Sequence, residues 1–234
     1  MTGAPTEDRR PCLIGTAHRT WHAGTGAPEP LEMMELVGRA AAEDAAARVD
    51  PLAHVDDLSV VHCQSWTYDD PPGRLADRLG LGKAARHESI LAGTSPQRLI
   101  NAAAERMLAG EAEVALVVGG EALHSRREYR SAGERPPWSH PHPAPPAMPV
   151  DLAEWHLPTE MAHGLLPAWL TFGLLEQARW AARGATAEDR SRLFRTMARL
   201  NDVAQRNPSA WFRTPRSADD LAAARTDNRM VTLP

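Results

Sequence analysis

The sequence has few cysteines and no long apolar run, and both absences restrict what the protein can be. Among 234 residues there are two cysteines, Cys12 and Cys63, and each lies in a short, strand-like apolar run. This setting favours buried free thiols over a disulfide. No apolar stretch approaches the roughly 20 residues of a membrane-spanning helix, and the first ten residues lack the apolar segment of a secretion signal. We therefore expect a cytoplasmic protein without a membrane span.

Charge and motifs argue against further classes of function. The formal net charge of -4 lacks the positive excess of a nucleic-acid-binding protein, so we expect no nucleic acid partner. Neither a GxGxxG nor a GxxxxGK[S/T] motif occurs, which removes the support for nicotinamide and P-loop nucleotide sites. His140 and His142 stand one residue apart in a proline-rich run, a spacing that is too little for a metal site, and we predict none.

The most informative stretch runs from Arg86 to Leu123 and has the pattern of a strand, a turn, a helix and a second strand. Ser89–Ala92 is a short, mostly apolar run. Pro96 suits a first helical turn, and Gly110 suits a helix end. Val114–Val118 is a continuous valine-rich run, which is typical of a parallel strand covered on both faces. A unit of this kind places the helix N-terminus at the carboxyl edge of a parallel sheet.

Several candidate site residues lie in the turns of this unit. Thr94 and Ser95 stand at the expected helix start, where a hydroxyl serves as a cap, and they are also the candidate nucleophiles. Gly93 precedes them. Gly119 and Gly120 follow the second strand and predict a tight turn at the same edge.

The flanking segments extend the alternation of strands and helices. The patterns predict strands at Cys12–Thr16 and Asp57–Cys63, and helices at Leu31–Arg48 and Arg74–Leu79. Together with the central unit, this order predicts an α/β fold in residues 1–123, with a mostly parallel sheet of four strands and helices on both faces.

The chain changes character after Leu123. Residues 124–150 are rich in Pro, Arg and His without periodicity and predict an extended linker. Residues 151–234 predict a helical subdomain, with a helix at Leu165–Arg183, another from a Thr186 cap to about Arg206, and a short helix capped by Ser217.

Residues 86–123 also resemble one known family. A glycine turn, a helix with a small-residue face, the Ala-Gly-Glu-Ala-Glu stop at 109–113, a hydrophobic strand and Gly-Gly-Glu at 119–121 resemble the thiolase superfamily. In that family this segment carries the nucleophilic cysteine at the helix start, and the position falls on Gly93 here. The helix after Thr186 resembles part of the thiolase loop domain. The resemblance implies the N-terminal thiolase half plus the loop domain, without the second half.

The resemblance further implies a ligand and a set of functions. The expected ligand is an acyl-CoA thioester, with no bound cofactor, and the implied activity is that of a lipid-transfer-type acetyl-CoA acetyltransferase in lipid metabolism. Because Gly93 cannot form the acyl-enzyme, two alternatives stay open: a cysteine-free aldolase acting on sterol side-chain CoA thioesters with a partner subunit, and a non-catalytic binding or scaffold subunit. A homo-oligomer is equally compatible. The expected substrate-binding residues are Gly119, Gly120, His156, Glu160, His163 and Trp211.

Overall fold

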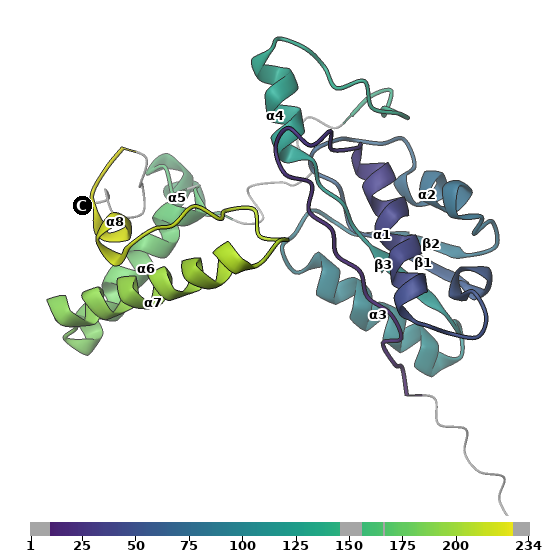
Figure 1. Cartoon of the computed structure of the whole chain (residues 1–234), viewed down its shortest axis with the longest axis horizontal. Coiled ribbons are helices and arrows are strands. Elements are labelled where there is room, and N and C mark those ends of the chain that lie inside the picture. Colours follow the sequence, from purple (N-terminus) through teal and green to yellow (C-terminus); the bar gives the residue numbers. More distant parts are fainter. Residues whose placement is uncertain (1–9, 146–155, 166, 227–234) are drawn as a thin grey trace, which may run out of the picture. The chain divides into compact units, whose positions relative to one another are not determined.

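The computed structural model describes residues 10–145, 156–165 and 167–226. The chain divides into two compact units, Met1–Pro149 and Val150–Pro234, which we call the N-terminal unit and the C-terminal unit. In Figure 1 the first runs from purple to teal and the second from green to yellow. Each unit is described by itself.

The N-terminal unit is built on a parallel sheet of three short strands. These are β1 (Asp57–Val60), β2 (Ala85–Glu88) and β3 (Ala115–Val118), in the order β2-β1-β3. Asp57 of the central strand pairs with Ala85 on one side and with Ala115 on the other. Right-handed crossover helices are the usual connection between parallel strands. The predicted α/β class with a parallel sheet is confirmed.

Helices cover both faces of this sheet. On one face α1 (Pro30–Asp44) and α2 (Pro71–Leu79) pack onto the apolar side of β1, and the core contains Leu31, Met34, Leu58, Val60 and Leu75. Each of these five side chains is fully buried. Helix α3 (Ser95–Ala109) contacts β1 and β3. A short 3-10 turn, η1 (Pro51–His54), precedes β1, and α4 (Leu123–Ser131) follows β3.

The face of β1 toward α3 is polar. The fully buried Asp57 accepts hydrogen bonds from Nε and Nη2 of Arg106 in α3, and the Nη2···Oδ1 distance is 3.0 Å. The buried hydroxyl of Ser59 donates to Asp57 at 3.2 Å and accepts from Arg106 at 3.3 Å. A buried carboxylate requires such partners, because an unpaired charge away from water is strongly unfavourable.

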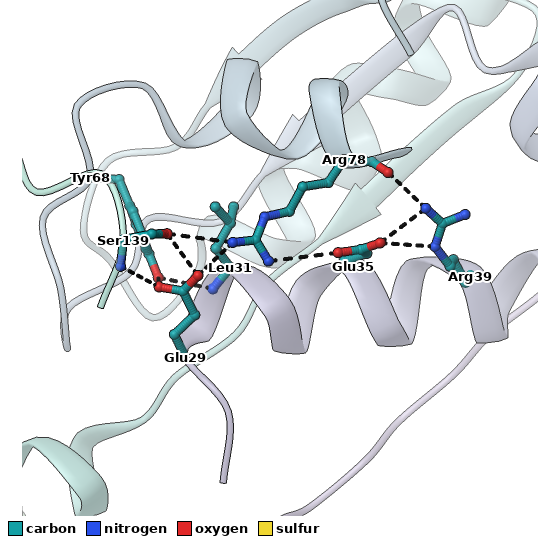
Figure 2. A network of polar contacts seen from close by, with 7 residues as sticks. All are labelled: Glu29, Leu31, Glu35, Arg39, Tyr68, Arg78 and Ser139. Carbon is teal, nitrogen blue, oxygen red and sulfur yellow. Dashed lines mark hydrogen bonds and ion pairs between the residues drawn. The ribbon is translucent and has the colours of Figure 1, made fainter. Parts of the chain in front are cut away.

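A network of polar contacts fixes the segment after α4 to this unit (Figure 2). The Glu29 carboxylate accepts hydrogen bonds from the backbone N–H and the hydroxyl of Ser139, both at 2.7 Å, and from Arg78 at 2.6 Å. Tyr68 accepts the N–H of Leu31, in the first turn of α1, at 3.0 Å. Residues 139–142 also pair with the loop after β1, with an isolated antiparallel bridge between Tyr68 and Pro141.

The C-terminal unit consists of helices in its described part. They are α5 (Pro158–Ala162), α6 (Ala168–Arg183), α7 (Ala187–Arg206) and α8 (Ala218–Ala222). The caps expected at Thr186 and Ser217 are present, since these hydroxyls accept from the N–H groups of Asp189 and Asp220. None of the residues described in 156–226 is buried.

Four local expectations are wrong. No strand forms at Cys12–Thr16, where Leu13 is 82% exposed and the Thr16 N–H bonds to the Asp44 carboxylate at 2.8 Å. Cys12 is accordingly exposed, not buried. The strand expected at Ser89–Ala92 is four residues early, at β2, because the strand at the sheet edge is polar and exposed and carries no apolar pattern. The segment expected as an extended linker begins instead with α4. Because no strand forms at Cys12–Thr16, the part of the chain that is described has three strands and not four.

Candidate functional site

The carboxyl ends of the three strands bring separate loops together at one edge of the sheet. The Val61 N–H donates to Val118 at 2.8 Å, and the Ser89 N–H donates to Val60 at 3.0 Å. The loops after β1, β2 and β3 therefore begin side by side. In open parallel sheets this edge is where ligands bind.

Both candidate hydroxyls, of Thr94 and Ser95, lie at the start of α3. Ser95 is buried, and its hydroxyl donates to the carbonyl of Ile90 at 2.6 Å. Thr94 is exposed and takes the N-cap position, but its side chain makes no capping hydrogen bond. The Ser95 hydroxyl therefore holds the β2–α3 loop in place. Among the residues that the structure describes, none forms a hydrogen bond with the Thr94 hydroxyl that would make it a base for this group. The cap expected from Thr94 or Ser95 is not formed.

Three glycines lie at this edge, and close packing requires glycine at two of them. A Cβ at Gly119 would lie 2.9 Å from Cβ of Val61, and one at Gly120 would lie 2.9 Å from the carbonyl oxygen of Pro30. Both positions need glycine for close packing. A Cβ at Gly93 would meet no atom within 4 Å, and its φ is outside the left-handed region. Residue 93 therefore has open space, and neither packing nor backbone conformation requires glycine there.

The cysteine nearest to this edge is not a nucleophile. Cys63 follows β1, is buried, and its Sγ lies 3.2 Å from the Ser65 hydroxyl. Burial, with a contribution from the Glu121 carboxylate, raises the pKa of Cys63 to about 11. Glu121 itself accepts the backbone N–H groups of Gln64 and Ser65 and so joins the ends of β1 and β3. The Cys63 sulfur stays a neutral thiol near pH 7.

A histidine–glutamate pair at the edge was missed in the sequence. Nδ1 of His62 lies 3.1 Å from Oε1 of Glu88, and the two residues come from the ends of adjacent parallel strands. The backbone N–H of His62 donates to the Ser89 hydroxyl at 3.0 Å. No sequence motif joins residues 26 positions apart. The sequence carried no signal for the pair, because the strand predicted at Ser89–Ala92 placed Glu88 before a strand and not at the end of one.

The remaining candidates belong to the C-terminal unit. Glu160 accepts the N–H of Leu157 at 2.8 Å and so caps α5, which gives it a local structural contact. His163 is exposed at the end of the same helix, and His156 is half-buried before it. Trp211 lies beyond α7 and is 39% exposed. Their role as substrate-binding residues stays a prediction.

Other expectations concern metals and membranes. In residues 10–145, 156–165 and 167–226, no group of three or more His, Cys, Asp or Glu side chains is arranged to hold a metal ion. His140 and His142 use backbone groups to pair with the loop that holds Thr67 and Asp69. Within the same described ranges, no helix has both the length and the apolar character needed to cross a bilayer.

Comparison with solved structures identifies the fold. The crystal structure of a monomeric SCP2-thiolase-like protein type 1 from Mycobacterium smegmatis matches 94% of this chain with a TM-score of 0.68 and 24% sequence identity. The fold is SCP2-thiolase-like. The chain spans 40% of the length of that protein. No family model and no curated protein matches the sequence.

The carboxyl edge of this thiolase-like fold thus has a defined chemical character. It combines the open position at Gly93, the His62–Glu88 pair and a carboxylate, Glu121, that is fully engaged with backbone N–H groups. The thiol at this edge, on Cys63, is buried and protonated.

Proposed function

We propose that this protein binds acyl-CoA thioesters at the carboxyl edge of its sheet and does not form an acyl-enzyme there. The observation that supports the proposal is the open position at Gly93 directly before α3, within a chain of SCP2-thiolase-like fold. Open space at the end of parallel strands, beside a helix N-terminus, suits a polar thioester group.

A more specific proposal would be the acetyl-CoA acetyltransferase reaction, but Gly93 offers no nucleophile for it. Acyl transfer of that class uses a thiolate as the covalent nucleophile. Residue 93 has no side chain, Ser95 is committed to the carbonyl of Ile90, and the Cys63 thiol is buried. We therefore assign to this chain the binding of the CoA thioester without covalent catalysis.

Equilibrium binding tests the proposal. The complete chain is titrated with acetyl-CoA in a calorimeter, and we expect saturable binding. Gly93→Trp fills the open position and should weaken binding by about tenfold or more, which corresponds to about 1.4 kcal/mol. Gly82→Trp is the matched control, because Gly82 is also exposed, free of Cβ contacts and outside the left-handed region, but precedes β2 at the opposite edge.

The outcomes separate the alternatives. Equal loss of binding in both tryptophan variants would indicate general damage and remove the assignment to Gly93. Absence of binding by the wild-type chain would refute the proposal itself. Thermal melting of both variants accompanies the titrations, so that unfolding is recognised.

A further inference from the structure

The His62–Glu88 pair has the geometry of an oriented base. His62 is 20% and Glu88 34% exposed in their side chains, so the pair is partly shielded from water but accessible. The Nδ1···Oε1 distance is 3.1 Å. The histidine backbone is fixed as well, since its N–H donates to the Ser89 hydroxyl. The end of β2 therefore holds His62 at two points, the imidazole through Glu88 and the backbone through Ser89.

The chemistry of the two groups decides the tautomer. An ionised carboxylate only accepts hydrogen bonds, so the proton between Nδ1 and Glu88 resides on the imidazole. In the neutral ring Nε2 then carries the lone pair. Among the residues that the structure describes, no hydrogen bond or ion pair to Nε2 of His62 is present. The base atom is available to a ligand, and a carboxylate behind the ring stabilises the imidazolium that forms when it takes a proton.

The pair is connected to the open position at residue 93. The Ser89 hydroxyl, which accepts from His62, donates to the carbonyl of Ile90 at 2.9 Å. The hydroxyl of Ser95, at the start of α3, donates to that same carbonyl. These contacts bind the end of β1 to both ends of the short loop that contains Gly93.

Among the described residues of this edge, the serine hydroxyls and the cysteine thiol are not available as covalent nucleophiles, and the exposed Thr94 hydroxyl has no hydrogen-bonded base to activate it. The hydroxyls of Ser89 and Ser95 are both engaged with Ile90, and Cys63 is buried as a thiol. Since Gly93 leaves open space where a side chain could stand, a water molecule can take the place of the nucleophile. A base is then needed to activate that water.

We propose that His62, positioned by Glu88, is the general base that activates water for hydrolysis of an acyl-CoA thioester at this edge. Nε2 removes a proton from water as its oxygen bonds to the thioester carbonyl carbon. The carbon–sulfur bond then breaks, and the imidazolium returns the proton to the departing thiolate. The products are a carboxylic acid and free CoA, with no oxidant, metal or second substrate. This inference rests on the proposed binding of CoA thioesters.

Hydrolysis of acetyl-CoA by the complete chain, followed by loss of thioester absorbance, is the test. We expect His62→Gln to lower kcat by about 100-fold or more with little change in KM, in the range typical of general-base removal. Glu88→Gln should lower kcat less than His62→Gln does and leave KM nearly unchanged, because the carboxylate that orients Nδ1 of the imidazole and stabilises the imidazolium is gone. His54→Gln, an exposed histidine in η1 before β1, is the matched control and should keep wild-type rates.

Each result distinguishes this inference from the binding proposal. Wild-type chain that binds acetyl-CoA but does not hydrolyse it faster than buffer overturns the inference and leaves binding intact. Unchanged turnover in folded His62→Gln also overturns it. Absence of both binding and hydrolysis overturns both proposals. If His62→Gln does not fold, His62→Ala with added imidazole replaces it: recovery of turnover with imidazole supports the base, and lack of recovery refutes it.

Discussion

Replacing Glu29 should loosen the segment around Ser139 more than any other part of the N-terminal unit. The side chain of Glu29 is 11% exposed and accepts three short hydrogen bonds, two from Ser139 and one from Arg78. Glu29→Gln keeps the size of the side chain but removes its charge and one acceptor oxygen. The amide N–H₂ that replaces this oxygen is a donor and cannot accept from either partner.

The expected loss follows from these contacts. A hydrogen bond to a charged group contributes roughly 1.5–3 kcal/mol, and bonds that share one acceptor group do not add. Arg78 retains a second carboxylate, Glu35, at 3.7 Å, so it does not become an unpaired charge. We therefore expect Glu29→Gln to lower the free energy of unfolding of the N-terminal unit by about 3 kcal/mol.

The effect depends on pH in a defined direction. Burial alone would raise the pKa of Glu29, but the hydrogen bonds from Ser139 and Arg78 outweigh it and lower the pKa below 4.5. Because the folded-state pKa is depressed, the stabilisation is present above pH 4.5 and is lost as the pH falls through the folded value. Wild type and Glu29→Gln should differ most near neutrality and converge in acid.

Hydrogen exchange and urea unfolding measure this prediction. The Ser139 N–H donates directly to Glu29, so a peptide covering residues 136–142 should exchange up to about 100-fold faster in the variant, equivalent to the expected free energy. Glu32→Gln is the control, since Glu32 is exposed in the first turn of α1, the helix that Glu29 precedes. Unchanged exchange in this peptide together with an unchanged urea midpoint would show that the network contributes no stability.

Three further predictions rest on other contacts. At pH 8 a disulfide reagent should modify one thiol per native chain, the exposed Cys12, and none in Cys12→Ser, because the pKa of Cys63 is raised to about 11; modification of Cys63 in the native protein would contradict its burial. Gly119→Ala and Gly120→Ala should each lower the free energy of unfolding by about 1–3 kcal/mol through overlap with Val61 or Pro30, whereas Gly93→Ala should be neutral within about 0.5 kcal/mol; equal urea midpoints for all three would refute the close packing. Asp57→Asn should cost about 3–5 kcal/mol, because it leaves Arg106 without its buried counter-charge, and a loss below about 1 kcal/mol would show that the pair is dispensable.

The central unit from β2 to β3 shows what local patterns can predict. Helix α3 and strand β3 lie where Pro96, Gly110 and the valine-rich run placed them, because capping, turn and apolar signals all agree there. The caps of α7 and α8 were predictable for the same reason. These signals are local, so they do not depend on which other elements pack against the helix or strand.

Features that depend on contacts between residues far apart in the chain could not be predicted from the sequence. Strand β2 is polar and lies at a sheet edge, so its place is set by pairing with β1 and not by its own composition. The four-residue error there also concealed the pair at the carboxyl edge, because Glu88 appeared to precede a strand rather than end one. Cys12–Thr16 shows the opposite case: its composition suits a strand, but no described strand pairs with it.

The two chemically different faces of β1 also determine which alternative pairings are possible. Asp57 and Ser59 face Arg106, while Leu58 and Val60 lie in the apolar core. A shift of one residue in register would turn the carboxylate into the apolar core and leave two aliphatic side chains against a guanidinium. A strand of four residues has little area with which to favour one alignment, so the penalty for misalignment supplies the selectivity. The buried ion pair therefore specifies the register of β1 in the sheet. Misaligned states during folding are disfavoured by the cost of burying an unpaired charge, and less by the loss of apolar contacts.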